Sequence, residues 1–165
     1  MNYKSLQEIV NLAQSESLEF WEVIAREEAI SQNANQSQIF EQMRKMYHAM
    51  KQSITQDDSR QKSPSGMSGG DGEKMRQYRR THQTIAGDLL SKIMETAMMV
   101  AESNACMKKI VAAPTAGSCG VLPAVLHVFE VEKGYHEDKI VEALFVAAGI
   151  GEILALNASI SGAVG

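Results

Sequence analysis

Apolar residues recur every three or four positions along most of this chain, which is the spacing of helices that bury one face. The first such stretch opens with Ser5 and Glu8, whose spacing predicts a capping box. Ser17 and Ser37 are the expected N-caps of a second and a third helix. No stretch of useful length alternates apolar and polar residues as a strand does, so the pattern predicts an all-α fold.

The same spacing continues in the second half of the chain, in three further stretches. Residues 81–104 form the first and residues 123–133 the second, while His136 opens the third. Pro123 suits the first turn of its helix, because the N–H that proline lacks would be unpaired there. Gly134 is expected to end that helix.

Residues 57–74 interrupt the helical pattern with a run rich in serine and glycine. This composition is typical of a flexible linker between two helical parts. The glycines do not form a phosphate-binding loop of the Walker type, because no Gly-Lys-Ser or Gly-Lys-Thr ends the run and no apolar strand precedes it. If ordered, the segment could offer backbone N–H groups and serine hydroxyls to a small anion.

The most unusual stretch, residues 112–123, combines two prolines, two glycines, two hydroxyl side chains and one cysteine. Gly117 and Gly120 allow a positive φ or a close approach of the backbone. The loop is expected to hold the Cys119 thiol at a helix N-terminus, where the helix dipole and free N–H groups favour a thiolate. Such a thiolate is a metal ligand or a nucleophile; the alternative is a buried and inert cysteine.

Composition limits the classes of function. With 165 residues the chain can form one domain with a substantial core. A net charge of −4, with both signs mixed along the helices, leaves no basic face for nucleic acid. The N-terminal residues lack the apolar segment of a signal peptide, and no apolar run approaches the roughly 20 residues of a membrane helix. Two cysteines without a disulfide pattern fit a reducing compartment, so a cytoplasmic protein is expected.

Three stretches together resemble one known family. Residues 113–126 resemble the signature of the iron–sulfur-dependent L-serine dehydratases, and residues 65–71 resemble an upstream glycine-rich segment of their α chain. Residues 157–163 are similar to the stretch just before the family's cysteine-rich motif. The resemblance covers essentially the whole chain. It implies that residues 1–165 are the front part of the α-chain catalytic domain, with residues 57–74 as a loop, and that the natural chain continues after Gly165.

The resemblance also implies a reaction and a cofactor. Family members convert L-serine to pyruvate and ammonia without pyridoxal phosphate, as a step of amino-acid degradation and gluconeogenesis. A [4Fe–4S] cluster held by three cysteines leaves one iron open, which acts as a Lewis acid and helps the substrate hydroxyl to leave. On this mapping Cys119 is one cluster ligand, and Cys106 matches no ligand position. The remaining ligands are therefore expected beyond residue 165, and this part of the chain is expected to be inactive alone.

Hydroxyl and amide side chains in the three stretches are candidates to bind the serine substrate: Ser65, Ser68, Thr115, Ser118, Asn157, Ser159 and Ser161. Loop capping or a turn explains each of them equally well. The resemblance implies that the catalytic base lies on a dehydratase β chain or domain, and it matches no histidine of this chain. His127, in the helix after the cysteine loop, is expected to face the surface. Faces that meet the rest of the α chain and the β chain should be apolar, so this part of the chain could self-associate into a homo-oligomer.

Two other functions fit the residues. A related lyase that acts on cysteine would have a similar loop, and a non-catalytic helical interaction module would contain Cys119 as an inert thiol. Iron binding by the complete enzyme separates the lyases from the interaction module. Pyruvate formed from serine without release of sulfide separates the two lyases.

Overall fold

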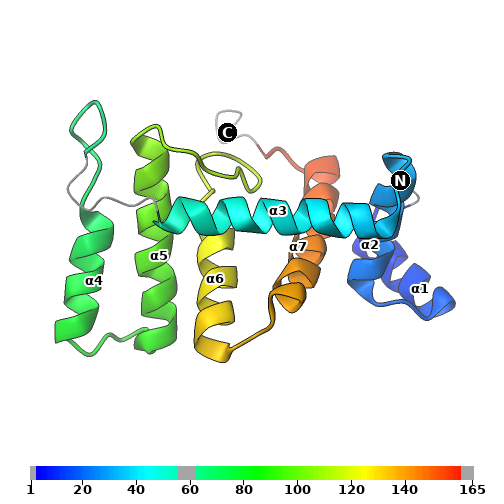
Figure 1. Ribbon diagram of the computed structural model, residues 1–165, viewed down its shortest axis with the longest axis horizontal. Coiled ribbons are helices and arrows are strands. Elements are labelled where there is room, and N and C mark those ends of the chain that lie inside the picture. The colour runs from blue at the N-terminus through cyan, green and yellow to red at the C-terminus, as the bar shows by residue number, and fades with distance from the viewer. Residues whose placement is uncertain (1–2, 56–61, 161–165) are drawn as a thin grey trace. The chain divides into compact units, whose positions relative to one another are not determined.

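The computed structural model describes residues 3–55 and 62–160, and every regular element in these ranges is a helix (Figure 1). The helices are α1 (Leu6–Glu16), α2 (Phe20–Ser31), α3 (Gln36–Thr55), α4 (Asp71–Thr81), α5 (Gly87–Ala105), α6 (Val121–Lys133) and α7 (Glu137–Asn157). The predicted all-α fold is confirmed for the part of the chain that the structure describes.

The chain forms two compact units. The first contains residues 1–47 and 136–165, and the second contains residues 48–135. Each unit has its own packing and is described by itself. The assignment of residues 1–165 to the front of one catalytic domain stays a prediction.

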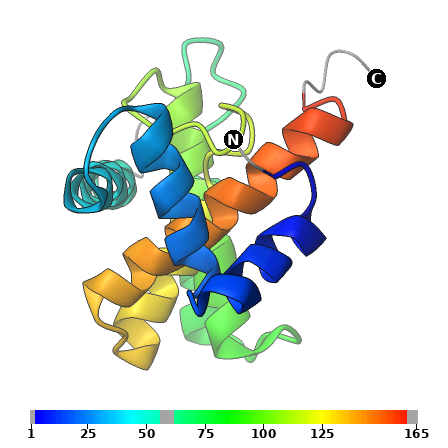
Figure 2. The same cartoon turned by 90° about the vertical axis from the view of Figure 1, so that its right-hand side faces the viewer.

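In the first unit, α2 lies across α7 and packs against it, with α1 beside α2 (Figure 2). Ile9, Val23, Val141 and Phe145 are buried in its core. Gly149 allows the close approach of α7 to α2, because a Cβ atom at this position would lie 2.3 Å from Cδ1 of Ile24. The helical faces that the apolar spacing predicts therefore do form the core of this unit.

The predicted start of α1 is confirmed. The Ser5 hydroxyl accepts a hydrogen bond from the Glu8 N–H at 3.3 Å, and the Glu8 carboxylate accepts one from the Lys4 N–H at 2.6 Å. The prediction for Ser17 is wrong, because this residue ends α1 in a left-handed conformation with φ 54°. Its N–H donates to the Ala13 carbonyl, so it belongs to the preceding helix rather than to the next one.

The helices after α1 begin at other residues than the serines predicted. Glu19 is the N-cap of α2, and it forms a capping box with Glu22. The prediction of Ser37 as a cap is also wrong. The Asn35 side-chain oxygen accepts from the Gln38 N–H at 2.8 Å, and the Gln38 side-chain oxygen accepts from the Asn35 N–H at 3.0 Å. Carboxylate and amide side chains can cap a helix as well as serine, and the apolar spacing does not tell them apart.

In the second unit, α5 lies between α4 and α6 and packs against both (Figure 1). Gly134, with φ 66°, ends α6 as predicted, and Pro123 lies buried in its first turn. The boundary of the serine- and glycine-rich segment is wrong, because α4 begins at Asp71, inside residues 57–74. This helix carries mostly charged side chains and contains Gly72, so it lacks the apolar spacing on which the prediction depends.

The expectation that no segment approaches membrane-spanning length is wrong for α7. Among the described helices, this one is long and apolar enough to cross a bilayer by length and composition. It also buries Ile140, Leu144 and Phe145 in the first unit. A buried core helix passes the same test, so length and composition do not assign α7 to a membrane.

Candidate functional site

The cysteine loop, defined as residues 112–120, places Cys119 directly before Gly120, which is the N-cap of α6. The predicted position at a helix N-terminus is confirmed, and the Cys119 side chain is fully buried. Gly120 makes the close backbone approach that its residue type allows, because a Cβ atom there would lie 2.4 Å from the Ala97 carbonyl oxygen of α5. Gly117 has neither a close contact nor a positive φ.

The predicted thiolate at Cys119 is not what this structure favours. Burial raises the pKa of the Cys119 thiol, and a backbone hydrogen bond lowers it by less. Desolvation therefore outweighs this hydrogen bond, and the neutral thiol is favoured. A thiolate at this position needs a positive partner such as a metal ion.

Two hydroxyl groups form the turn of the cysteine loop. The Thr115 and Ser118 hydroxyls lie 3.0 Å apart, and the Ser118 hydroxyl donates to the Ala113 carbonyl at 3.0 Å. The Ser118 N–H donates back to the Thr115 hydroxyl at 3.3 Å. These bonds favour a role for both side chains in shaping the loop. Their role in substrate binding stays a prediction.

The glycine-rich segment, defined as residues 62–70, is a second loop of the same unit. The hydroxyls of Ser63 and Ser65 lie 3.1 Å apart, and Gly69 and Gly70 have positive φ values of 126° and 90° as the chain turns into α4. A shallow cavity of about 230 Å³ lies beside Ser68. It is lined by Ser68, Asp71, Met98, Ala101, Glu102 and Ala105.

The last turns of α5 contact the first turn of α4, which follows the glycine-rich segment, and the cysteine loop. The Glu102 carboxylate accepts hydrogen bonds from the backbone N–H groups of Asp71 and Gly72, the second at 3.2 Å. Two residues later, the Asn104 side chain donates to the Ala116 carbonyl of the cysteine loop at 3.0 Å. The N–H groups expected to bind a small anion thus have a protein carboxylate at the start of α4. Sequence reasoning missed both Glu102 and Asn104.

The predicted site residues are divided between the two units. Ser65, Ser68, Thr115, Ser118 and Cys119 belong to the second unit, and Asn157 and Ser159 belong to the first. The Asn157 side chain donates to the Ile153 carbonyl of its own helix at 2.8 Å, and Ser159 is exposed. Ser161 lies outside the described residues. The structure thus brings five of the seven described candidates into one unit, on two loops at the end of α5.

Comparison with known proteins decides the family. The family model for the serine dehydratase alpha chain matches residues 15–165. The chain belongs to this family. The resemblance that the three stretches carry is therefore confirmed.

Curated L-serine dehydratases match this chain over stretches of different length. A probable L-serine dehydratase alpha chain of Bacillus subtilis (strain 168) is 29% identical over 163 residues, which cover 99% of this chain and 54% of the relative. The L-serine dehydratase alpha chain of Peptoniphilus asaccharolyticus is 28% identical over 160 residues, or 96% of this chain and 55% of the relative. The L-serine dehydratase of Streptomyces coelicolor is 47% identical over 68 residues, or 41% of this chain and 15% of the relative.

The chain spans about half the length of the first two of these relatives. A search of the solved structures found no significant match. The arrangement of the loops around α5 therefore rests on this structure alone.

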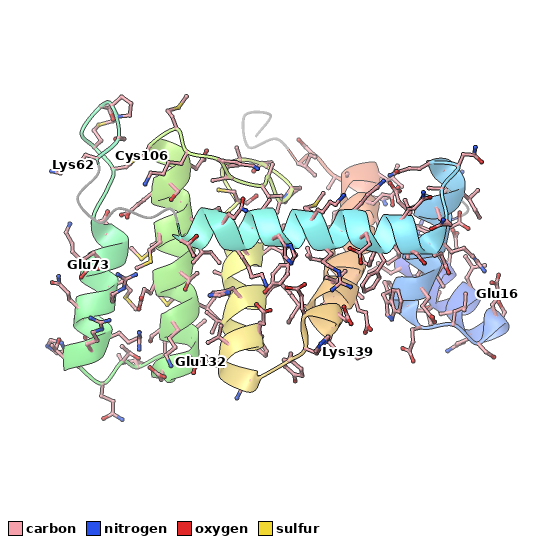
Figure 3. All side chains as sticks on the ribbon, in the orientation of Figure 1. Glu16, Lys62, Glu73, Cys106, Glu132 and Lys139 are labelled. Carbon is pink, nitrogen blue, oxygen red and sulfur yellow. The ribbon has the colours of Figure 1, made fainter. Side chains whose placement is uncertain are left out.

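The iron–sulfur cluster that the family resemblance implies needs several thiolate ligands. Within residues 3–55 and 62–160, no three His, Cys, Asp or Glu side chains are grouped as metal ligands. Both cysteines are free, and Cys106 is half-buried at the C-terminal end of α5 (Figure 3). The described residues of this chain thus offer Cys119 as a candidate ligand and do not complete a cluster site.

The histidines occupy positions of several kinds. The expectation that His127 faces the surface is wrong, because its side chain is only 30% exposed and burial lowers its pKa. Its Nδ1 atom lies 3.8 Å from the Glu130 carboxylate. His82 and His136 are caps of α4 and α7, and His48 is exposed on α3.

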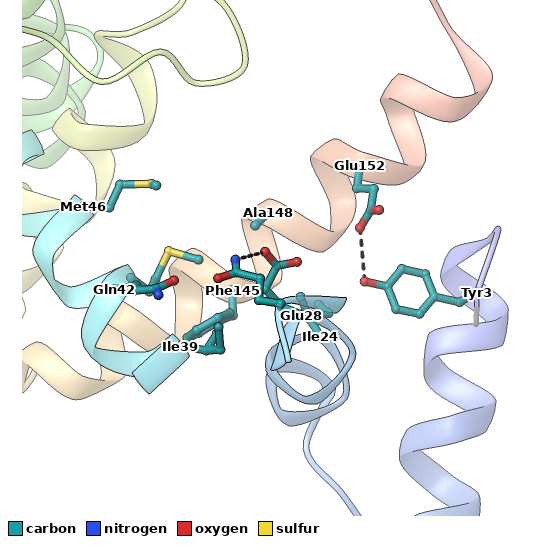
Figure 4. Close-up of a pocket in the computed structure, with 11 residues that line it drawn as sticks. Tyr3, Ile24, Glu28, Ile39, Gln42, Met46, Phe145, Ala148 and Glu152 are labelled. Carbon is teal, nitrogen blue, oxygen red and sulfur yellow. Dashed lines mark hydrogen bonds between the residues drawn. The ribbon is translucent and has the colours of Figure 1, made fainter. Parts of the chain in front are cut away.

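The first unit contains a cavity of about 220 Å³ that is unrelated to the predicted residues (Figure 4). Apolar side chains such as Ile24, Ile39 and Phe145 form much of its lining. At its edge the Tyr3 hydroxyl donates to the Glu152 carboxylate at 3.2 Å. None of the predicted substrate or metal residues lines this cavity, so its size does not identify it as the site of serine chemistry.

Proposed function

We propose that this chain is part of an L-serine ammonia-lyase, which converts L-serine to pyruvate and ammonia. The observation that carries the proposal is the match to the serine dehydratase alpha chain family over residues 15–165. Two curated relatives that cover nearly the whole chain have L-serine dehydratase in their names. The other half of those relatives is not represented here, so the activity is assigned to the assembled enzyme.

The proposed cofactor is a [4Fe–4S] cluster, with Cys119 as one of its ligands. This residue is held in a fixed loop, away from water, at the start of α6. The chain contains only two cysteines, so the remaining ligands are assigned to parts of the enzyme outside these 165 residues. When bound, such a cluster supplies an open iron that acts as a Lewis acid on the substrate hydroxyl. No pyridoxal phosphate is required.

The residues of this chain have binding and positioning roles in the proposal. Ser68 lines the cavity beside the glycine-rich segment and is the candidate with the clearest access to a small molecule. Thr115 and Ser118 keep the cysteine loop in its turn, so they fix the direction from which the Cys119 thiol would meet the cluster. The base that removes the α-proton of serine is assigned to a β chain or domain.

A partner β chain has a candidate surface on α7. Ile150 and Leu154 lie four residues apart on one face of this helix and are 37% and 56% exposed. Leu156 and Ile160, at its C-terminal end and just after it, are exposed as well. Apolar side chains that gather on a surface are typical of protein–protein contacts. We assign this surface to contact with the rest of the dehydratase or with a second copy of the chain. The two free cysteines fit a cytoplasmic enzyme.

The experiment is anaerobic reconstitution of the complete enzyme with iron and sulfide. The wild type is expected to show visible iron–sulfur absorbance and to form pyruvate and ammonia from L-serine. The variant Cys119→Ala is expected to lose both the absorbance and the activity, because a ligand is missing. Cys106→Ala is the matched control, since it removes the other free thiol, and it should keep both.

Other results would assign a different function. Sulfide released from L-cysteine, with no pyruvate from L-serine, would indicate the related cysteine lyase. A complete enzyme that binds no iron would indicate a helical interaction module with an inert Cys119. Full absorbance in Cys119→Ala would remove this residue from the ligand set.

A further inference from the structure

The start of α4 is held by a side chain from a distant part of the sequence. Most helices of this kind have an N-cap side chain that binds the free N–H groups, but here the N-cap is Gly70, which has no side chain for the purpose. The Glu102 carboxylate binds the N–H groups of Asp71 and Gly72 instead. A carboxylate at this position is favoured by the dipole of α4 as well as by the hydrogen bonds.

The packing around this contact leaves little freedom. A Cβ atom on Gly72 would lie 2.7 Å from Cγ of Met99 and 3.4 Å from the Glu102 carboxylate. The first turn of α4 therefore lies directly against α5, and Gly72 is buried. Because Ser68 precedes this turn by only three residues, its position depends on the contact between Glu102 and α4.

The cysteine loop is held from the same turn of α5. Asn104 follows Glu102 by two residues and donates to the Ala116 carbonyl at 3.0 Å. Gly120 lies against the Ala97 carbonyl, two turns earlier on the same helix. One rigid helix thus determines the positions of the glycine-rich segment and the cysteine loop, and the cavity beside Ser68 is lined by this part of α5.

We propose that Glu102 is a positioning residue of the serine site. By holding the first turn of α4, it places Ser68 and the glycine-rich segment against α5, the helix from which Asn104 holds the cysteine loop. This inference rests on the proposed function, because it assigns both loops to one binding site for L-serine. Glu102 acts through the backbone of Asp71 and Gly72 and is not assigned any contact with the substrate.

The first test measures steady-state kinetics of the complete, reconstituted enzyme. Glu102→Ala is expected to raise the KM for L-serine about tenfold with a smaller change in kcat, because charge-assisted hydrogen bonds that position the loop are lost. Glu102→Gln keeps an acceptor oxygen and should recover most of the wild-type KM. A general loss of folded enzyme would lower the apparent kcat and leave KM unchanged, so the split between the two constants separates positioning from stability.

The control for the first test is Glu132→Ala. Glu132 pairs with Lys92 at 2.9 Å, near the other end of α5, so this variant removes a carboxylate from the same unit without touching either loop (Figure 3). Its KM should equal that of the wild type. A wild-type KM in Glu102→Ala, or an equal rise in Glu102→Gln or in Glu132→Ala, would overturn the inference.

The second test does not depend on activity. Backbone hydrogen exchange of the complete enzyme without substrate should become faster at Asp71 and Gly72 in Glu102→Ala, and should stay slow in Glu132→Ala. Unchanged exchange in Glu102→Ala would overturn the inference whatever the enzyme catalyses. Faster exchange combined with a wild type that does not deaminate serine would overturn the proposed function and leave the contact itself established.

Discussion

The two halves of α5 are held to their neighbours in different ways. In the first half, Glu95 accepts hydrogen bonds from Arg76 and Arg79 of α4, both at 2.9 Å, and Lys92 pairs with Glu132 of α6 at 2.9 Å. In the second half, Glu102 and Asn104 bind backbone groups of other segments. The ion pairs of the first half therefore join side chain to side chain. In the second half, Glu102 and Asn104 bind the main chain of the first turn of α4 and of the cysteine loop.

This difference separates stability from positioning. In the first half both partners of each ion pair are long side chains, which can follow small shifts of a helix, so these pairs hold the helices together without fixing them closely. A bond to a backbone N–H or carbonyl fixes the main chain itself, within the narrow range of hydrogen-bond geometry. The helix start that follows Ser68 and the loop that carries Cys119 are attached by bonds of the second kind. The half of α5 with backbone contacts is thus the half expected to position the residues of the candidate site.

The largest effect is expected for Glu95→Ala in the first half. Its carboxylate is 11% exposed and is shared by two guanidinium groups. Its removal takes the least exposed carboxylate from Arg76 and Arg79, which still pair with Glu73 and Asp88. The free energy of unfolding should fall by about 3 kcal/mol, the lower end of the cost of breaking a buried ion pair, because the arginines are partly solvated. Urea unfolding of the chain measures this loss.

Lys139→Ala is the control for that prediction. Lys139 also forms an ion pair, with Glu142 at 2.7 Å, but its side chain is 67% exposed (Figure 3). Its removal should leave the unfolding midpoint unchanged within error. If Glu95→Ala were as stable as Lys139→Ala, the first half of α5 would not depend on its buried charges.

The next largest effect is expected for Gly120→Ala, compared with Gly117→Ala in the same loop. A methyl group at Gly120 would meet the Ala97 carbonyl of α5 at 2.4 Å, and this backbone atom cannot rotate away. The free energy of unfolding should fall by about 2 kcal/mol, which is typical of overpacking. At Gly117 the nearest atom is the Thr115 hydroxyl at 3.8 Å, so this variant should be neutral in the same unfolding measurement. Equal losses in the two variants would contradict the close contact of the loop with α5.

The sequence allowed the all-α fold to be predicted because most helices bury one face and show it in their spacing. The helix that escaped prediction, α4, is held by Arg76 and Arg79 through charges on α5, and such pairs leave no apolar period in the sequence. The N-caps of α2 and α3 were misassigned because Glu19 and Asn35 perform the role expected of serines. Local sequence rules allow several residues to serve as the N-cap of a helix, and tertiary packing determines which of them does.

The candidate site was predictable only in its local part. The prolines and glycines of the loop and the expected start of the next helix predict that Cys119 lies just before α6. Its burial depends on packing against other parts of the chain, which the loop sequence does not reveal. Burial is also the reason that its pKa is raised rather than lowered. Glu102 and Asn104 escaped prediction because their partners lie about 30 and 12 residues away, where no periodicity or motif links the positions.

The smallest predicted effect concerns pH, and it distinguishes the charged Asp88 contact in the first half of α5 from the neutral Asn104 contact in the second. Lys92 and then Arg79 lower the pKa of the Asp88 carboxyl below its ordinary value of 3.8. A lowered pKa in the folded state stabilises the fold above about pH 4, and this contribution is lost as the pH falls toward the folded-state pKa. The difference in melting temperature between wild type and Asp88→Asn should therefore be small at pH 6 and smaller still at pH 3.

The control is Asn104→Ala, which removes a bond between neutral groups. Its difference in melting temperature from the wild type should not follow the ionisation of Asp88. If both differences shrank together between these pH values, the two halves of α5 would not differ in the kind of contact that holds them.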